Sequence, residues 1–248
     1  MTELSRTFGY QAVDELERER RIRRVFEAIA HRYDVMNDLM SLGIHRLWKR
    51  RFVALAGARA GQTIVDLAGG TGDVAARMAG ADRLVMVCDP SLPMMGVGQR
   101  RGHAHVQWLG GTGEHLPLAD ASVDTLTIAF GIRNVTRLDD ALAEIRRVLK
   151  PGGRFLCLEF STPHALIRPL YHLFSFTVIP RLGAFIAREP EAYSYLVESI
   201  RRFPDQRSFK ALIEKAGFEA VTFRNLSLGI ACIHAGAKPA APALEPPR

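Results

Sequence analysis

The chain has 248 residues, enough to bury the core of one large domain or of a domain with an appended cap. Hydrophobic residues make up 48% of it and charged residues 24%, a balance that excludes a chain disordered throughout its length. The formal net charge of +7 favours an anionic partner, either a membrane face or a polyanion, and excludes no class of chemistry.

The first 50 residues are expected to be helical and strongly charged, and their lack of an apolar run predicts no secretion signal. Within them lies YDVMNDLMSLGIHRLWK (residues 33–49), which has neither the periodicity of an amphipathic helix nor the alternation of a strand. The role of this segment follows only from the elements after it.

Between about residues 63 and 160, short runs rich in β-branched residues alternate with helical segments. This alternation predicts βαβ crossovers, and therefore a parallel sheet with helices on both faces. The helix over residues 138–149 is expected to stop at Lys150-Pro-Gly-Gly. The predicted strands are TIVDLA, LVMVC, VQWL, VDTLTIAF and GRFLCLEF, and the predicted helices are DVAARMAG and LDDALAEIRRVL.

The pattern changes after residue 160. Residues 163–207 resemble helices with aromatic-rich faces, which indicates an insertion and not a further crossover. Their longest apolar run, residues 170–179, is too short to span a bilayer. A last helix, SFKALIEKAGF, precedes two strand-like runs, AVTFRN and GIACIHAGAK, which we expect to pair antiparallel at the edge of the sheet.

Three cysteines lie far apart, each in an apolar run that indicates a buried strand: Cys88, Cys157 and Cys232. Their spacing supports neither a disulfide framework nor a metal site, and no metal is expected. We therefore expect a reducing compartment, the cytoplasm.

A glycine-rich turn, VDLAGGTGDVA (residues 65–75), follows a predicted strand and opens a predicted helix. Gly70-x-Gly72-x-x-Ala75 fits the dinucleotide fingerprint, and Asp89 ends the next strand where an acid would hold ribose hydroxyls. A tight strand-to-helix connection is the simpler explanation of such a turn, but the position of Asp89 favours a nucleotide-like ligand.

Two carboxylates, Asp66 and Asp73, bracket the turn. A pyrophosphate needs free backbone N–H groups and is disfavoured by nearby carboxylates. The pair instead suits a ligand with an ammonium end and a sulfonium centre, which indicates S-adenosylmethionine and not NAD. Beyond the third predicted strand, Thr112 and Gly113 are placed to meet an adenine edge, and the next strand ends at Ala129-Phe130, where ligands bind in open α/β sheets.

Four blocks of sequence are more specific than this core: residues 33–49, VDLAGGTGD (65–73), AFGIRNV (129–135) and AYSYLVESIRRFPDQ (192–206). Together they closely resemble the quinone-biosynthesis C-methyltransferase family, whose members methylate demethylmenaquinol or 2-polyprenyl-6-methoxy-benzoquinol. The resemblance covers roughly residues 7–236. It implies a class I S-adenosylmethionine-dependent methyltransferase, an α/β Rossmann-like doubly wound fold with a mostly parallel seven-stranded sheet.

The resemblance also implies a division of the chain. The expected parts are an N-terminal helical lid (1–50), a cofactor-binding core (51–162), an inserted helical cap (163–207), the C-terminal part of the core sheet (208–236) and a flexible tail (237–248). Carried over by position, the cofactor residues are Thr71, Asp89, Thr112 and Gly113, and the turn and the fourth strand add Asp66, Gly70, Gly72 and Ala129.

Three departures from the family pattern change what is expected of this site. Many relatives have Asn-Ala at residues 112–113 and Ser at residue 129, so contacts there should use backbone groups or water. Relatives also tend to have Asp-Ala-Asp where this chain has Arg188-Glu189-Pro190-Glu191, and Pro190 should change how the following helix begins.

Carbon methylation needs an electron-rich ring, so a base, or a cation that stabilises a phenolate, should lie near the methyl group. Arg133 is the first candidate for that cation. Because arginine stays protonated, a water network reaching a carboxylate or His45 is the expected base, although His45 has a structural role as its alternative. Asn134 either hydrogen-bonds a quinol oxygen or caps a turn.

The segment 33–49 is then expected to be a lid whose Tyr33, Met36 and Asn37 face the ring, with Phe130 beside it.

The apolar stretch 170–187, which includes Phe174, is expected to hold a polyprenyl tail or to meet a membrane, with simple packing under the cap as its alternative. Arginines there and at 20–24 suit anionic lipid headgroups. The expected partners are a polyprenylated quinol, the inner face of a membrane, and a homodimer or a quinone-biosynthesis complex, with no nucleic acid.

Three alternatives stay open. An NAD-dependent oxidoreductase explains the glycine turn, but no matching Tyr-x-x-x-Lys pair accompanies it. A nucleic-acid-binding scaffold explains the charge, but the arginines of ELERERRIRR (15–24) alternate with Glu and lack interleaved aromatic residues. The third is a methyltransferase for another phenolic or lipid acceptor, and within the family the ring is a naphthoquinol, a benzoquinol or both.

Overall fold

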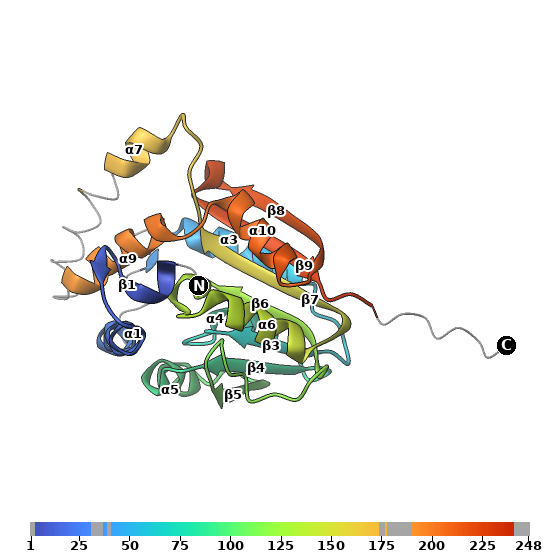
Figure 1. Cartoon of the computed structure of the whole chain (residues 1–248). Coiled ribbons are helices and arrows are strands. Elements are labelled where there is room, and N and C mark those ends of the chain that lie inside the picture. Colours follow the sequence, from blue (N-terminus) through green and yellow to red (C-terminus); the bar gives the residue numbers. More distant parts are fainter. Residues whose placement is uncertain (1–2, 31–36, 39–40, 174–176, 178–189, 241–248) are drawn as a thin grey trace.

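A computed structural model describes residues 3–30, 37–38, 41–173, 177 and 190–240 (Figure 1). Within these ranges no helix is long and apolar enough to cross a membrane. The three cysteines are buried in strands, as the sequence predicts: Cys88 in β4 (Leu84–Asp89), Cys157 in β7 (Leu149–Phe160) and Cys232 in β9 (Ala231–Ala237).

Seven strands form one sheet in the order β5-β4-β3-β6-β7-β9-β8 (Figure 1). The five strands from β5 to β7 run parallel to one another, whereas β9 runs antiparallel to both of its neighbours, β7 and β8. The predicted parallel sheet and its antiparallel edge pair are both confirmed. The strands are β3 (Thr63–Leu67), β4 (Leu84–Asp89), β5 (Val106–Gly110), β6 (Val123–Ala129), β7 (Leu149–Phe160), β8 (Glu219–Leu226) and β9 (Ala231–Ala237).

The strand order reverses at β3. The chain moves outward from β3 to β4 and β5 and then returns to the other side of β3 as β6. Leu67 of β3 lies level with Cys88 of β4 and Ile128 of β6, so the turns after these strands open at the same edge of the sheet. In doubly wound sheets, ligands bind in the crevice outside the carboxyl ends at this reversal.

Each face of the sheet packs against its own helices because neighbouring strand residues point to opposite faces. Val65 and Leu67 belong to a buried cluster with residues of α6 and α10, and Ile64 belongs to a second one with residues of α3, α4 and α5. The core helices are α3 (Ile44–Ala56), α4 (Asp73–Met78), α5 (Leu92–Arg100), α6 (Leu138–Val148) and α10 (Gln206–Lys215). The sheet is therefore covered by an apolar core on both faces.

A smaller apolar core joins the N-terminal residues to the inserted region. Helix α1 (Glu15–Ile29) and the short hairpin of β1 (Thr7–Phe8) and β2 (Gln11–Ala12) pack against α9 (Pro190–Arg202). The ring of Phe8 stacks on that of Tyr195, with centroids 4.3 Å apart. Figure 1 shows α1, β1 and α9 gathered at one end of the sheet, while α7 (Arg168–Leu173) stands apart from them.

Arg18 fastens α1 to the loop after β6. Its buried guanidinium donates to the backbone oxygens of Thr7, Arg133 and Asn134 and to the hydroxyl of Thr136. A buried guanidinium is stable only when its donors are satisfied, and this one finds four acceptors. Arg18 therefore joins the N-terminal helix to the carboxyl edge of the sheet.

The helices expected in the first 50 residues include α1 and the start of α3. The expectation that residues 33–49 lack the periodicity of an amphipathic helix is wrong at the end of that segment, because α3 begins at Ile44 and runs without a break to Ala56. Its buried stripe includes His45 and Lys49 beside Trp48 and Phe52, and these two polar residues hide the helical period. The helix predicted over 138–149 ends at Val148, because the next residue already belongs to β7.

Three of the four expected boundaries between parts fall inside elements of the fold, and the one at residues 162–163 lies in the loop after β7. Residue 50 lies within α3, residue 208 within α10, and residue 237 ends β9. Lys238 still pairs with Gly152 and Gly153 through backbone hydrogen bonds, and residues 241–248 of the expected tail lie outside the described residues. Pro190 is the first residue of α9, where an imino acid without an N–H is tolerated.

Candidate active site

A cavity of about 450 Å³ lies at the carboxyl edge of the sheet, where the strand order reverses. Its size falls within the range of pockets that bind cofactors and small molecules. One wall is the turn after β3, another is the loop after β6, and α1 contributes Leu16, Ile22 and Phe26. Among the described residues, no group of three or more His, Cys, Asp or Glu side chains is arranged to hold a metal ion.

The glycine turn is as tight as the sequence suggests. Gly70 and Gly72 have φ angles of 55° and 76°, which favour residues without a Cβ atom. A Cβ on Gly70 would lie 2.9 Å from the Met94 side chain, and one on Gly72 would lie 2.7 Å from Trp108. Gly70 and Thr71 line the cavity, whereas Gly72 serves the packing behind it.

Asp89 faces the cavity with a carboxylate that the backbone holds in place. One oxygen accepts the N–H of Gly70 at 2.8 Å and the other accepts the N–H of Ser91 at 2.7 Å. Burial raises the pKa of this carboxyl, and the two N–H groups act against that shift. Each carboxylate oxygen keeps a second lone pair, which leaves Asp89 able to accept hydrogen bonds from a diol.

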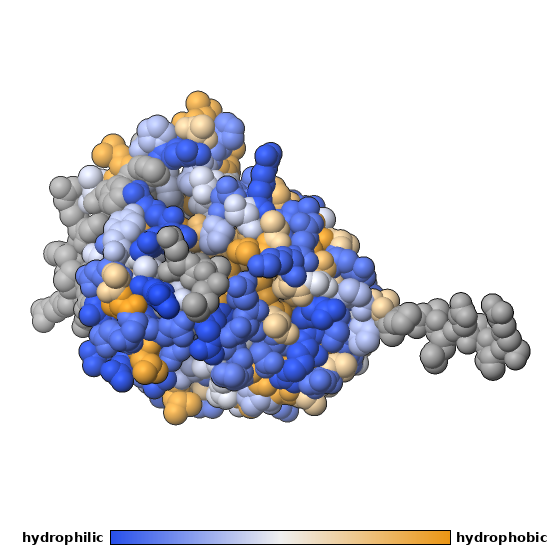
Figure 2. Space-filling view, viewed as in Figure 1, coloured by the Kyte–Doolittle hydropathy of each residue, from blue (hydrophilic) through white to orange (hydrophobic). Residues whose placement is uncertain are grey.

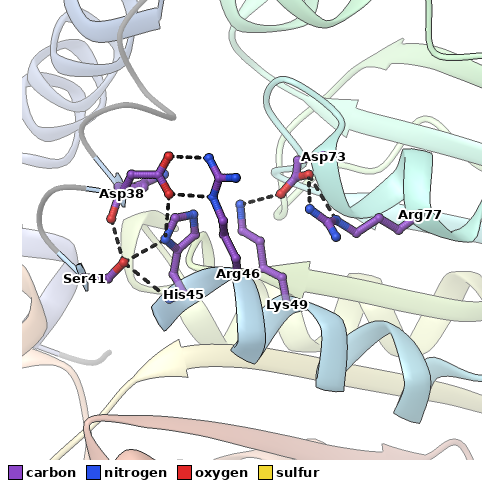
Figure 3. Close-up of polar contacts among 8 residues, drawn as sticks. Asp38, Ser41, His45, Arg46, Lys49, Asp73 and Arg77 are labelled. Carbon is purple, nitrogen blue, oxygen red and sulfur yellow. Dashed lines mark hydrogen bonds and ion pairs between the residues drawn. The ribbon is translucent and has the colours of Figure 1, made fainter. Parts of the chain in front are cut away.

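Asp66 and Asp73 differ in environment although both line the cavity. Burial raises the pKa of Asp66 to about 7, and the hydroxyl of Thr127, 2.8 Å away, opposes that shift. Burial also acts to raise the pKa of Asp73, but the positive charges of Lys49 and Arg77 outweigh this effect and lower the pKa. Figure 3 shows Lys49 reaching Asp73 from α3 and Arg77 meeting the same carboxylate from the other side.

The other end of the cavity is built from the turns after β5 and β6. Thr112 and Gly113 line it, and a Cβ on Gly113 would come within 3.2 Å of Val135. Ala129 and Phe130 line it as well. Phe130 has a φ of 59°, an uncommon value for a bulky residue, and its ring packs on Phe160 at a centroid distance of 4.8 Å.

The three catalytic candidates occupy different places. Asn134 lines the cavity, and its side-chain oxygen accepts the hydroxyl of Tyr195 at 2.9 Å. Arg133 is buried behind the wall, where its guanidinium pairs with Glu159 at 2.8 Å and donates to the backbone oxygen of Phe130. Neither Arg133 nor His45 is among the lining residues.

His45 belongs to a hydrogen-bonded cluster next to the cavity. Its Nδ1 lies 2.7 Å from the hydroxyl of Ser41, and a carboxylate oxygen of Asp38 lies 3.8 Å from the same nitrogen (Figure 3). Burial lowers the pKa of His45, and Lys49 lowers it further. Within the described chain this arrangement favours the structural alternative for His45 over that of a base.

The expected ring contacts are placed only in part. Phe130 lines the cavity, and Asn37 is half-buried with its backbone oxygen bonded to Ser41. Tyr33, Met36 and Phe174 lie outside the described residues.

Sequence reasoning missed several residues of this site. Lys49 was missed because a lysine within a charged helix is usually exposed. Glu159 was missed because it lies next to the end of β7, in the run FLCLEF, whose other residues are apolar. Glu159 is a clear signal in retrospect, since a charged side chain at the end of a buried strand needs a partner. Arg18 gave no signal, because its acceptors lie more than a hundred residues away in the chain, apart from Thr7.

Comparison with known proteins decides the family. The family model described as the ubiE/COQ5 methyltransferase family matches residues 14–238. The chain belongs to this family.

Relatives in the ubiE/COQ5 family match almost the whole chain. The Rubrivivax gelatinosus "Ubiquinone/menaquinone biosynthesis C-methyltransferase UbiE" is 74% identical over 97% of this chain and 96% of its own length. The protein of the same name from Acidiphilium cryptum is 50% identical over 92% of this chain and 95% of its own. The family that the sequence blocks resemble is thereby confirmed.

Solved structures show the same fold at low identity. An S-adenosylmethionine-dependent methyltransferase from Thermotoga maritima has a TM-score of 0.62 at 21% identity, with 88% of this chain and 99% of that one covered. The [4+2]-cyclase SpnF has a TM-score of 0.66 at 15% identity, covering 90% and 97% of the two chains. The predicted class I methyltransferase fold is confirmed, and the cyclase shows that this fold alone does not define a reaction.

Proposed function

We propose that the protein is an S-adenosylmethionine-dependent C-methyltransferase that methylates the ring of a polyprenylated quinol in ubiquinone or menaquinone biosynthesis, or in both. One observation carries the proposal: a single cavity joins the nucleotide-binding turn of β3 to the family-specific loop after β6. The near-complete match to UbiE relatives supports the same acceptor class.

The residues of the cavity fit the cofactor. Asp89 offers a fixed carboxylate to the ribose, Thr112 and Gly113 border the place for the adenine, and Asp66 is a buried carboxyl able to meet an ammonium. S-Adenosylmethionine would supply an electrophilic methyl group there. The chain's own contribution is to hold donor and ring in contact and to exclude water from them.

Asn134 is the residue proposed to touch the quinol oxygen. Its side-chain oxygen is engaged by Tyr195, so its NH₂ group is left to donate to a phenolate that forms on the ring. Arg133 lies one residue away, and its bonds to Glu159 and to the backbone of Phe130 keep the loop in its unusual conformation. Direct contact of Arg133 with the ring would require its guanidinium to leave Glu159.

We also propose peripheral contact with an anionic membrane on its cytoplasmic side, because the acceptor carries a long apolar tail. The net charge of +7 supports this, as do the exposed side chains of Leu166 and Leu173. The face in Figure 2 is largely hydrophilic, and apolar atoms stand out where Figure 1 places α7. The homodimer or biosynthetic complex expected from the sequence remains a prediction.

An anaerobic assay tests the proposal. The purified protein is offered S-adenosylmethionine with a reduced demethylmenaquinone or a reduced 2-polyprenyl-6-methoxy-benzoquinone, and the product is read by mass. We expect a gain of one methyl group on at least one ring. Methylation of neither ring would reject the acceptor class, and tight binding of NAD in a parallel titration would reject the cofactor.

A further inference from the structure

Lys49 is a buried cation in the wall of the cavity. It belongs to α3, its side chain is 7% exposed, and its ammonium lies 3.0 Å from a carboxylate oxygen of Asp73. Arg23 and Arg137, the other Lys or Arg residues that line the described cavity, belong to α1 and to the start of α6. Lys49 is thus the cation on the side of the glycine turn.

The ion pair with Asp73 does not account for this position. Arg77 already reaches Asp73 at 3.0 Å from the more exposed side, and it does so without a buried charge. Taking an ammonium out of water costs several kcal/mol unless nearby groups compensate it. Lysine has three N–H donors, and in the described part of the chain one of them has an acceptor, Asp73.

The neighbouring charges indicate what kind of group would complete the site. Asp66 and Asp73 both face this part of the cavity, so they would repel an incoming carboxylate unless a nearby cation offset their charge. Lys49 is that cation, since its charge contributes to the lowered pKa of Asp73 and opposes the rise that burial causes in the pKa of Asp66. A ligand with an ammonium and a carboxylate on one carbon atom would satisfy Asp66 and Lys49 together.

We propose that Lys49 binds the carboxylate at the methionyl end of the cofactor, beside Asp66, which takes the ammonium. This inference rests on the proposed function, because it assumes that S-adenosylmethionine occupies the cavity. It assigns to the N-terminal part of the chain a direct role in cofactor binding. That role is separate from covering the ring, because α3 packs in the core next to the glycine turn.

A cycle of four affinities tests the assignment. Titration calorimetry compares the native protein and Lys49→Met, each with S-adenosylhomocysteine and with its decarboxylated analogue. A charge-assisted hydrogen bond corresponds to roughly tenfold to a hundredfold in affinity. We expect Lys49→Met to lower the affinity for S-adenosylhomocysteine by that factor. The same substitution should change the affinity of the decarboxylated analogue by less than about twofold, because the bond is absent there.

Matched variants separate this role from the balance of charge around Asp73. Arg77→Met removes the other partner of Asp73 but lies outside the cavity lining, so S-adenosylhomocysteine should bind it almost as well as the native protein. Lys49→Arg keeps a cation and should recover part of the affinity. If Lys49→Met lost the same factor of affinity for both ligands, Lys49 would have a structural role only, and the inference would be overturned.

The native protein alone also decides the question if Lys49→Met fails to fold. Equal affinity of the native protein for the two ligands would exclude a carboxylate contact and reject the inference, while leaving the proposed function intact. Failure of the native protein to bind S-adenosylhomocysteine at all would instead reject the proposed function.

Discussion

Asp89 is held by two backbone N–H groups, from Gly70 and Ser91, so its carboxylate is oriented before any ligand arrives. We expect Asp89→Ala to lower the affinity for S-adenosylhomocysteine by about tenfold to a hundredfold, since charge-assisted hydrogen bonds to the ribose would be lost. Titration calorimetry measures the effect. Unchanged affinity in this variant would show that Asp89 does not bind the ribose.

Asp66 predicts a pH dependence of cofactor binding. Burial raises its pKa to about 7, with Lys49 and Asp73 as the charged groups that act on it most. A bound ammonium favours the ionised form, so binding would release a proton when Asp66 begins protonated. Affinity for S-adenosylhomocysteine should therefore fall as the pH drops below about 7 and level off above it.

Calorimetry in two buffers of different ionisation enthalpy checks this at pH values on each side of that pKa. The variant Asp66→Asn should bind more weakly and lose the proton release. If Asp66→Asn kept the native pH profile, another group would be responsible.

Arg133 and Glu159 form an ion pair whose side chains are 5% and 1% exposed. Neither charge would be stable in the core without the other. Removing the cation should cost about 3–5 kcal/mol of unfolding free energy, because the Glu159 carboxylate would stay buried without its partner. Urea unfolding of Arg133→Met tests this, and adding Glu159→Gln to that variant should recover much of the loss. Stability close to the native value in Arg133→Met would show that Glu159 is neutral in the native protein.

Residues that act through a local pattern could be predicted from the sequence, and residues that act through distant contacts could not. Asp66, Gly70 and Asp89 follow from the spacing of one strand, one turn and the next strand. Lys49 and Glu159 need the packing of α3 and β7 to place them, and no spacing in the chain contains that information.

Arg18 of helix α1 is buried and bonds to the loop after β6, and the more exposed ion pair of Glu15 with Arg137 links the same two parts of the chain. Replacing Arg18 by Leu leaves buried backbone oxygens without donors, which should cost about 1–3 kcal/mol of unfolding free energy. The exposed Arg24 on the same helix provides the control, and Arg24→Ala should change stability by less than about 0.5 kcal/mol. Equal effects of the two substitutions in urea unfolding would contradict the anchoring role.

Elements with a clear period were predicted well, and those with mixed composition were not. The five parallel strands and the edge pair follow from β-branched runs and their spacing. Helix α5 was not predicted, since LPMMGVGQR has two glycines in nine residues and a weak apolar stripe. The hairpin of β1 and β2 has only two residues in each strand, and it exists because Phe8 packs on Tyr195 of a distant helix.

The molecule as a whole carries a charge of +7, which predicts attraction to anionic lipid surfaces. Sedimentation with vesicles that contain anionic lipid should bring down the protein at low ionic strength and release it as salt is added. Neutral vesicles are the control. Retention that does not depend on salt would indicate apolar contact in place of charge, and no retention on either vesicle would reject peripheral binding.

The fold and the reaction were predictable to different degrees. Alternating strands and helices predict the doubly wound sheet, which the Thermotoga maritima enzyme shares at 21% identity. The reaction class came from the four short blocks and not from the fold, because the [4+2]-cyclase SpnF has the same architecture, with a TM-score of 0.66. The shape of the cavity was beyond prediction, since it depends on how α1 and α3 pack at the sheet edge.

Arg18 bonds to the backbone oxygens of Arg133 and Asn134, not to their side chains. Every amino acid carries a backbone oxygen, so a substitution at Asn134 leaves the hydrogen bond from Arg18 in place. Descendants of such a protein could therefore exchange the Asn134 side chain, which lines the cavity, while Arg18 still holds the loop after β6. A selection experiment for new aromatic acceptors should vary residue 134 and keep Arg18 and Arg133 constant.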